Sequence, residues 1–285
     1  MMTCDRGVWV GMISSGFRPL VFLSLLVLVA CSVQRAKPTM DSMATADVDP
    51  TLTVAKFIAQ AEEGHPEAVQ AMIAVGMDPN VRNDDGTTAL QAAVGNWHLD
   101  TVRVLIAAKA DVQVTDQNGA TLLHYAASGP FGAVPGGNIP LMKMLVDAGV
   151  PVDRANEAGL TPLMWVAHGG EASATEFLLT KGANANWKRL SGVTPLMDAA
   201  RGGKAQNVEL LLAHGADVNA AIPDDGMTAL MLAASRGAPD AVRALLRAKA
   251  DVNARRVDGT TALTMALMEG HTEIVEMLRA AGAKE

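Results

Sequence analysis

The sequence has very little cysteine and few aromatic residues. Its 285 residues include two cysteines, one tyrosine and 4% aromatic residues in total. So few cysteines exclude a disulfide framework and a cysteine-rich zinc site as the basis of the fold. His168 and His214 also have no cysteine, aspartate or glutamate at the spacing of metal ligands. We therefore expect neither a metal nor a cofactor.

Catalytic motifs and an excess of basic residues are missing as well. The chain contains no Gly-x-Ser-x-Gly elbow and no phosphate-binding glycine loop followed by lysine. Lysine and arginine number 23 against 30 aspartates and glutamates, which gives a net charge of −7. Affinity for nucleic acid depends on clustered cations. These absences argue against an enzyme and against a nucleic-acid-binding protein.

No apolar run is long enough to cross a membrane. The longest extends over residues 20–30, eleven residues, whereas a bilayer core needs about 20 helical residues. Arg6 and Arg18 precede this run, and a small residue, Ala30, ends it. A basic start, a short apolar stretch and a small boundary residue are typical of a secretory signal peptide. We expect residues 1–30 to be such a signal, starting at Met1, Met2 or Met12.

The end of this run resembles the lipobox of bacterial lipoproteins, through the sequence Leu28-Val29-Ala30-Cys31. The resemblance implies that Cys31 becomes the first residue and carries the lipid, and Ser32 after it implies retention at the outer membrane, facing the periplasm. An ordinary signal peptide and an uncleaved signal anchor are the alternatives. Residues 31–50 are polar and unpatterned, which predicts a flexible tether. Removing Asp5, Arg6 and Arg18 with the signal leaves 21 minus 29, or −8.

What the chain has in abundance is repetition. Glycines at 86, 119, 159, 192, 226 and 259 are 33, 40, 33, 34 and 33 residues apart, and similar sequences follow each one. A period of this length is typical of a solenoid, in which each unit buries its apolar face only by stacking on its neighbours. The chain from about residue 51 onward is therefore predicted to be one domain.

The parts of each unit predict a helical hairpin with a projecting turn. Thr161-Pro162 and Thr194-Pro195 have threonine as a helix N-cap and proline at the first helical position. Paired aliphatic residues such as Leu211-Leu212 belong to a second helix, and small alanines in the first helix allow close stacking. Closing segments such as 215–219 and Asp-Gly pairs such as Asp225-Gly226 predict tight turns.

These units resemble the ankyrin repeat family, most closely at residues 121–127 (Thr-Leu-Leu-His-Tyr-Ala-Ala) and at Gly270-His271. The resemblance implies an all-α stack of helical hairpins with protruding turns. We count seven repeats, the first and last being end caps. Their predicted bounds are 51–82, 83–115, 116–155, 156–188, 189–221, 222–255 and 256–285.

Three departures from the repeat pattern are informative. Residues 129–140 make the third unit longer, and their prolines and glycines predict a loop, either a tolerated insertion or a partner contact with Phe131 at its tip. Met164, Met197 and Met231 occupy the family's histidine position and should pack in the core. Trp187 at the start of a turn is either an exposed hot spot or partly buried against the adjacent turn.

The ankyrin resemblance implies that a protein partner binds the concave face, made by the turn tips and the exposed ends of the first helices. By position, the predicted contact residues are Asp84, Asp85, Thr87, Asn96, Gln117, Asn118, Phe131, Glu157, Leu160, His168, Trp187, Leu190, Ser191, Arg201, Asp224, Asp225, Met227, Arg236 and Asp258.

The leading hypothesis is a monomeric, non-catalytic protein-binding adaptor or scaffold that is held at the bacterial envelope by lipid on Cys31. Two alternatives remain open: an immunity-type or enzyme-guarding inhibitor lipoprotein, and a secreted ankyrin effector that acts on host proteins.

Overall fold

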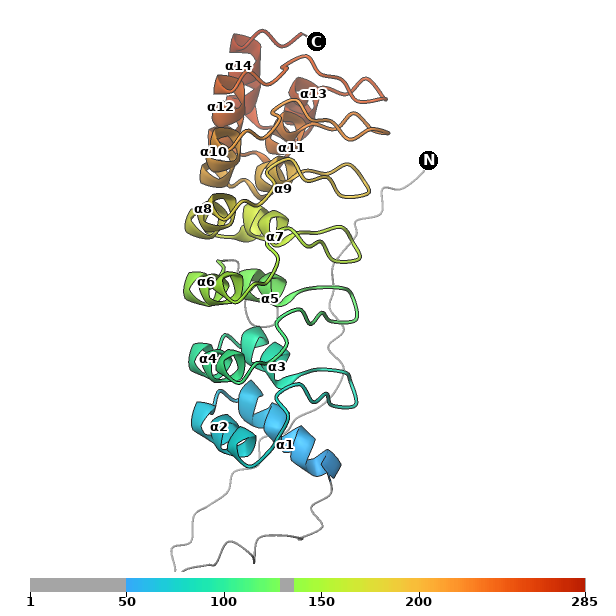
Figure 1. Ribbon diagram of the computed structural model, residues 1–285. Helices are drawn as coiled ribbons and strands as arrows, with labels where there is room; N and C mark the ends of the chain where they lie inside the picture. Colours follow the sequence, from blue (N-terminus) through green and yellow to red (C-terminus); the bar gives the residue numbers. More distant parts are fainter. Residues whose placement is uncertain (1–49, 129–135, 285) are drawn as a thin grey trace, which may run out of the picture. The chain divides into compact units, whose positions relative to one another are not determined.

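The computed structural model describes residues 50–128 and 136–284, which belong to one compact unit. Within these ranges the chain forms fourteen helices in seven antiparallel pairs and no strand, so the predicted all-α stack of seven helical hairpins is confirmed. The first helix of each pair lies beside the projecting turns and is called inner; the second is called outer (Figure 1). The inner helices are α1 (Pro50–Glu62), α3 (Ala89–Gly95), α5 (Leu122–Ser128), α7 (Pro162–Gly169), α9 (Pro195–Gly202), α11 (Ala229–Arg236) and α13 (Ala262–Met268). The outer helices are α2 (Pro66–Ala74), α4 (Leu99–Ala107), α6 (Ile139–Asp147), α8 (Ala172–Thr180), α10 (Ala205–Ala213), α12 (Pro239–Arg247) and α14 (Thr272–Ala280).

Threonine caps start the inner helices, as the sequence predicts. The side chains of Thr161 and Thr194 accept hydrogen bonds from the backbone N–H groups of Met164 and Met197, three residues on. Thr88 forms a complete capping box, because its own backbone N–H also donates to Oε1 of the Gln91 side chain. Each cap satisfies N–H groups that a helix start would otherwise leave unpaired.

Between successive pairs the chain forms a long turn that doubles back on itself, here called a finger. The six fingers include residues 82–88, 115–121, 155–161, 188–194, 221–228 and 255–261, and Figure 1 shows them projecting to the same side of the stack. The six glycines of the sequence period lie in these fingers with φ between +74° and +82°. A β-carbon on Gly192 would lie 2.4 Å from Pro223 of the next finger. All six positions therefore need a left-handed backbone, and at Gly192 the close approach of the next finger adds a second reason for glycine.

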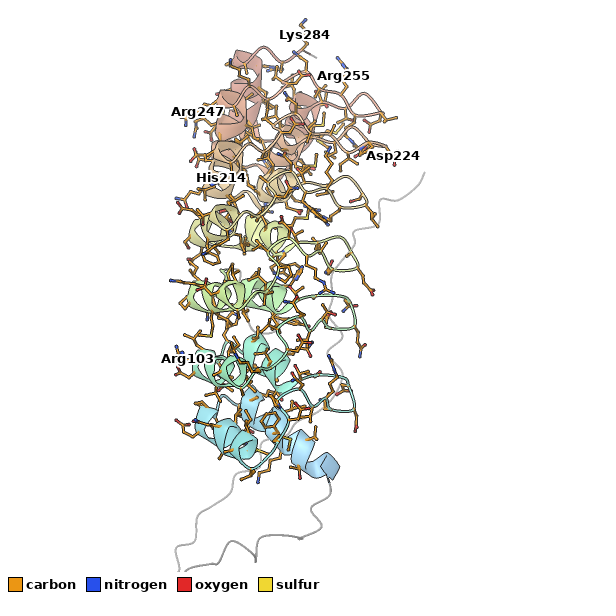
Figure 2. All side chains as sticks on the ribbon, in the orientation of Figure 1. Arg103, His214, Asp224, Arg247, Arg255 and Lys284 are labelled. Carbon is orange, nitrogen blue, oxygen red and sulfur yellow. The ribbon has the colours of Figure 1, made fainter. Side chains whose placement is uncertain are left out.

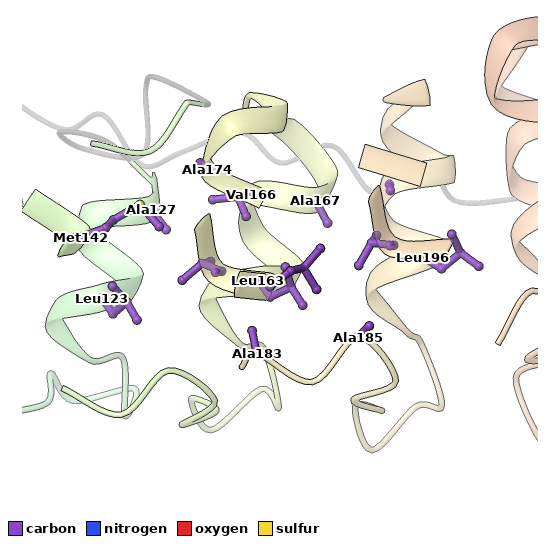
Figure 3. Close-up of a cluster of buried hydrophobic side chains, with 14 of the residues drawn as sticks. Leu123, Ala127, Met142, Leu163, Val166, Ala167, Ala174, Ala183, Ala185 and Leu196 are labelled. Atoms are coloured by element: carbon purple, nitrogen blue, oxygen red, sulfur yellow. The ribbon is translucent and has the colours of Figure 1, made fainter. Parts of the chain in front are cut away.

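The core is continuous along the stack. Side chains of α5, α7 and α9 meet those of α6, α8 and the segment 183–185 (Figure 3). Met164, Met197 and Met231 are at most 1% exposed, so the prediction that they pack in the core is confirmed. Because the apolar side of each hairpin is covered by its neighbours, no hairpin has a separate core.

Asparagine side chains link the segments that close each repeat. The Asn186 Oδ1 accepts from the backbone N–H of Asp217 at 2.8 Å, and its Nδ2 donates to the Gly215 carbonyl at 2.8 Å. Asn219 accepts from the Asp251 N–H at 2.8 Å in the same way. Asn80, Asn186, Asn219 and Asn253, at equivalent positions in four of the repeats, therefore each connect their repeat to the next.

One local prediction is wrong. Residues 129–140 were expected to form a loop, but α6 begins at Ile139, with Asn138 as its N-cap. Pro140 falls in the first turn, where its missing N–H would have no intrahelical partner in any case. Residues 129–135 lie outside the described ranges.

None of the helices in residues 50–128 and 136–284 combines the length and the apolar character needed to cross a bilayer. The predicted signal peptide, Cys31 and nearly all of the tether lie outside the described residues.

Candidate functional site

The predicted concave face corresponds to the fingertips together with the side of the inner helices turned toward the fingers. We call this surface the finger face. The fourth residue after each capping threonine points toward it, because Tyr125 and Asp198 both bond to side chains of their own finger. The residues at this position are Ala92, Tyr125, Trp165, Asp198, Leu232 and Met265.

Most of the predicted fingertip residues are exposed. Leu190 is 97% exposed, which is unusual for a leucine in a folded domain. The other exposed members are Asp84, Asp85, Gln117, Asn118, Glu157, Ser191, Asp224 and Asp258. Asp258 accepts hydrogen bonds from Thr260, which lowers the pKa of its carboxyl group. Acidic side chains thus lie at several tips.

Other predicted residues are partly buried and have roles inside the fold. Trp187 is half-buried, and its indole N–H donates to the Gly159 carbonyl of the preceding finger at 3.1 Å, which is the second of the two alternatives left open. Asp225 binds Arg256 of the next finger at 2.6 Å. Thr87, Leu160 and Met227 are likewise partly buried. These residues hold neighbouring fingers together or cover the core.

The predicted residues at the inner-helix ends differ in exposure. Asn96 is partly buried and donates from Nδ2 to the Ala92 carbonyl at 3.0 Å, whereas His168, Arg201 and Arg236 are exposed. The structure brings His168 close to the helix turn that carries Arg201. His168 Nδ1 lies 3.2 Å from the backbone carbonyl oxygen of Asp198, and Arg201 follows Asp198 by three residues. Phe131 and Cys31 lie outside the described residues.

A buried carboxylate stands at the middle of the finger face. The Asp198 side chain is 3% exposed, and both of its oxygens accept from Arg189 Nη2 at 2.7 Å. Arg201 Nη2 also donates to Asp198 Oδ1. Two guanidinium groups therefore share one carboxylate, and the cluster has a net charge of +1. Arg201 remains half exposed, while Arg189 is 19% exposed.

A second polar pair lies on the finger face of the third repeat. The Tyr125 hydroxyl donates to Asp116 Oδ2 at 2.7 Å, at the edge of an open hollow of about 500 Å³ between the second and third fingers. Burial and this bond to a carboxylate raise the pKa of Tyr125. The hollow is lined by residues of both fingers, including Arg82, Asp85, Gln91, Gln117 and Asn118.

Because Tyr125 is the only tyrosine of the chain, its ionisation can be followed directly. We expect tyrosinate absorbance at 295 nm to appear only above pH 10, the ordinary midpoint for tyrosine. In Asp116→Asn the midpoint should move toward 10, since the acceptor loses its charge. An unchanged midpoint in this variant would show that Asp116 does not control the ionisation.

The sequence of the chain matches a known family of repeat proteins. A sequence profile described as ankyrin repeats, in three copies, matches residues 57–134, 131–222 and 219–284. The chain belongs to the ankyrin repeat family. No curated protein sequence matches it closely enough to count as a relative.

A solved ankyrin repeat structure supports the same conclusion. The chain is similar to the ankyrin repeat domain of Bcl-3, described as a unique member of the IkappaB protein family, with 27% sequence identity and a TM-score of 0.65. The match covers 78% of this chain and 97% of the Bcl-3 domain. Domains of this kind are binding modules, and the matched family is not a catalytic one.

One ankyrin motif, Thr-x-x-His, occurs in full in the third repeat. The backbone N–H of Thr121 lies 3.0 Å from His124 Nδ1, and His124 Nε2 lies 2.9 Å from the Leu160 carbonyl. The first bond requires Nδ1 to be unprotonated, so the ring is the neutral Nε2–H tautomer and donates to Leu160. Burial lowers the pKa of His124 below 6.5, more than the Leu160 carbonyl and Asp116 raise it.

This geometry predicts a loss of stability in mild acid. Because the folded-state pKa lies below the unfolded value of 6.5, the unfolded chain binds the proton first, so the free energy of unfolding falls as the pH drops below 6.5 through the folded pKa. His124→Gln should reduce this dependence, since Gln91 makes the equivalent cap in the second repeat. Urea unfolding at pH 7.5 and at acidic pH measures the difference. An equal loss of stability in acid for the unchanged protein and for His124→Gln would contradict the prediction.

Sequence reasoning missed Asp198, Tyr125 and Trp165, although it identified the fingertips and helix ends around them. The available clue was position: Asp198 is a charged residue between the apolar Met197 and Ala199 of an inner helix, and it aligns with an aromatic residue in each of the two preceding repeats. Within the described ranges, no group of three or more His, Cys, Asp or Glu residues could hold a metal ion.

Proposed function

We propose that this protein is a non-catalytic adaptor of the bacterial cell envelope, anchored through lipid on Cys31, which binds a partner protein with its finger face. The ankyrin repeats make the chain a protein-interaction module. The finger face supports the choice of surface, because fingertip side chains such as Leu190 are exposed without serving the core. The anchor is supported by the sequence of residues 28–31.

Partner binding is tested by comparing two triple variants of the full chain in an envelope pull-down analysed by mass spectrometry. Asp84→Ala, Leu190→Ala and Asp224→Ala together remove exposed fingertip side chains that have no bond to another described side chain. Glu209→Ala, Arg247→Ala and Arg103→Ala together change exposed side chains of the outer helices α10, α12 and α4. Figure 2 labels Arg247 and Arg103. The fingertip variant should lose the partner and the outer variant should keep it. The reverse result would refute the finger face as the binding surface.

The anchor is tested separately by labelling cells with radioactive palmitate and fractionating the membranes. The unchanged chain should incorporate label and sediment with the outer membrane. Cys31→Ser should do neither, whereas Cys4→Ser should behave like the unchanged chain. Label in the Cys31→Ser variant, or an unlabelled chain in the medium, would refute the lipid anchor.

A further inference from the structure

The finger face of the fifth repeat is positively charged in an acidic protein. Its finger and inner helix contain Lys188, Arg189 and Arg201 against a single carboxylate, Asp198, so that 3 minus 1 gives +2. The whole chain has a net charge of −7. The nearby fingers carry acidic residues such as Glu157 and Asp224. A locally positive surface on a negatively charged protein attracts anionic ligands and repels cationic ones.

Arg201 is held in place by the buried carboxylate. Asp198 is 3% exposed and already accepts two hydrogen bonds from Arg189, so the additional bond from Arg201 orients that guanidinium without neutralising it. The Arg201 side chain is 49% exposed. Its remaining donors therefore face solvent in a fixed orientation, and the planar guanidinium group suits paired recognition of a carboxylate.

Two more cations of the fifth and sixth repeats, Lys188 and Arg236, have no ion pair within the described residues. Lys188 is exposed at the base of the fifth finger. Arg236 comes from the next inner helix, and its Cγ lies 3.7 Å from where a β-carbon on Gly203 would be, so it lies along the end of α9. Because neither cation is bound to a described carboxylate, both can bind an anionic ligand without breaking an existing pair.

An exposed aromatic ring adjoins this charge. Trp165 is 42% exposed and occupies the same position in α7 that Asp198 occupies in α9, and these two helices pack against each other. His168, one turn along α7, lies against the Asp198 carbonyl. Tryptophan and arginine are both enriched among the residues that dominate binding energy, and here they are exposed on two inner helices that pack together.

We infer that Trp165, Lys188, Arg201 and Arg236, here called the cationic site, bind an extended acidic segment of the partner protein. A carboxylate of that segment pairs with Arg201, and a neighbouring apolar side chain packs on Trp165. The inference rests on the protein-binding function proposed above and adds the chemistry of the partner. The acidic tips elsewhere on the finger face repel a uniformly acidic ligand, so the segment must combine acidic and apolar residues.

The test uses the full chain in nonionic detergent and a display library of random twelve-residue peptides. We expect the selected peptides to be rich in Asp and Glu next to Leu, Phe or Trp, with affinity that falls as salt rises. Arg201→Gln and Trp165→Ala should each weaken binding of a selected synthetic peptide about tenfold. Arg247→Gln, an equal loss of charge on the outer helix α12, should leave the affinity unchanged.

The Arg201→Gln variant retains the Arg189–Asp198 pair, so circular dichroism should show an unchanged fold. Peptides without acidic residues, no selected peptide at all, or equal effects of Arg201→Gln and Arg247→Gln would overturn the inference. The proposed function would survive each of these results if the envelope partner still required the fingertip residues. Loss of that requirement would refute the function itself.

Discussion

Replacing Leu211 by alanine is expected to lower the free energy of unfolding by about 2 to 5 kcal/mol, the range for large-to-small changes in a packed core. Leu211 is fully buried on α10, which packs against α8, α9 and α12. The cavity would therefore open among three repeats at once. In a solenoid each repeat contacts only its neighbours, so the loss falls on the interfaces that couple the fifth repeat to the fourth and sixth.

Leu190→Ala is a matched control, because the same atoms are removed from a leucine that is 97% exposed in the adjoining finger. Its cost should be within about 0.5 kcal/mol of zero. Thermal and urea unfolding of both variants measure the difference. Similar costs for the two substitutions would show that the stack is not held by the outer-helix leucines.

The second large effect is expected at Asp198. Asp198→Ala should destabilise the fold by about 3 kcal/mol, because removing one member of a buried ion pair leaves the other charge without compensation. Arg189 is 19% exposed, and its Nε has no hydrogen-bond partner among the described residues even with Asp198 present. Arg201, at 49% exposed, can turn to solvent and should contribute less to the loss.

Two further variants isolate this effect. Asp240→Ala removes the carboxylate of the exposed Arg243–Asp240 pair, whose two residues are three apart, as in the Arg201–Asp198 pair. This change should cost less than about 0.5 kcal/mol. Adding Arg189→Ala to Asp198→Ala should cost less than the sum of the single changes, which measures the coupling between the two groups. Equal costs at Asp198 and Asp240 would mean that burial of the pair is energetically unimportant.

The fold was predictable because its causes are local and recur. Every unit after the first repeats a finger glycine with positive φ and a threonine before its first helix, and these are short-range features that a sequence displays directly. The one wrong boundary, the start of α6 at Ile139, comes from treating Pro140 as a helix breaker where it is tolerated in the first turn.

The candidate surface was only partly predictable. The exposure of Leu190 and of the acidic tips follows from their place in a finger. The structural roles of Trp187 and Asp225 do not, because their partners, Gly159 and Arg256, belong to other fingers 28 and 31 residues away. A pattern read one repeat at a time contains no information about which side chains of neighbouring repeats touch.

By itself the sequence determined the helical-hairpin repeat with its projecting turn and the number of repeats, because capping, turn geometry and apolar periodicity act within a single unit. Only the tertiary structure decided which charges remain available. Folding of the fifth repeat buries Asp198 between Arg189 and Arg201, and stacking ties Asp225 to Arg256 of the next finger, while Lys188 and Arg236 stay without an ion pair in the described part of the chain. Electrostatic interactions depend on distance through space, and the packing of one repeat on the next sets those distances.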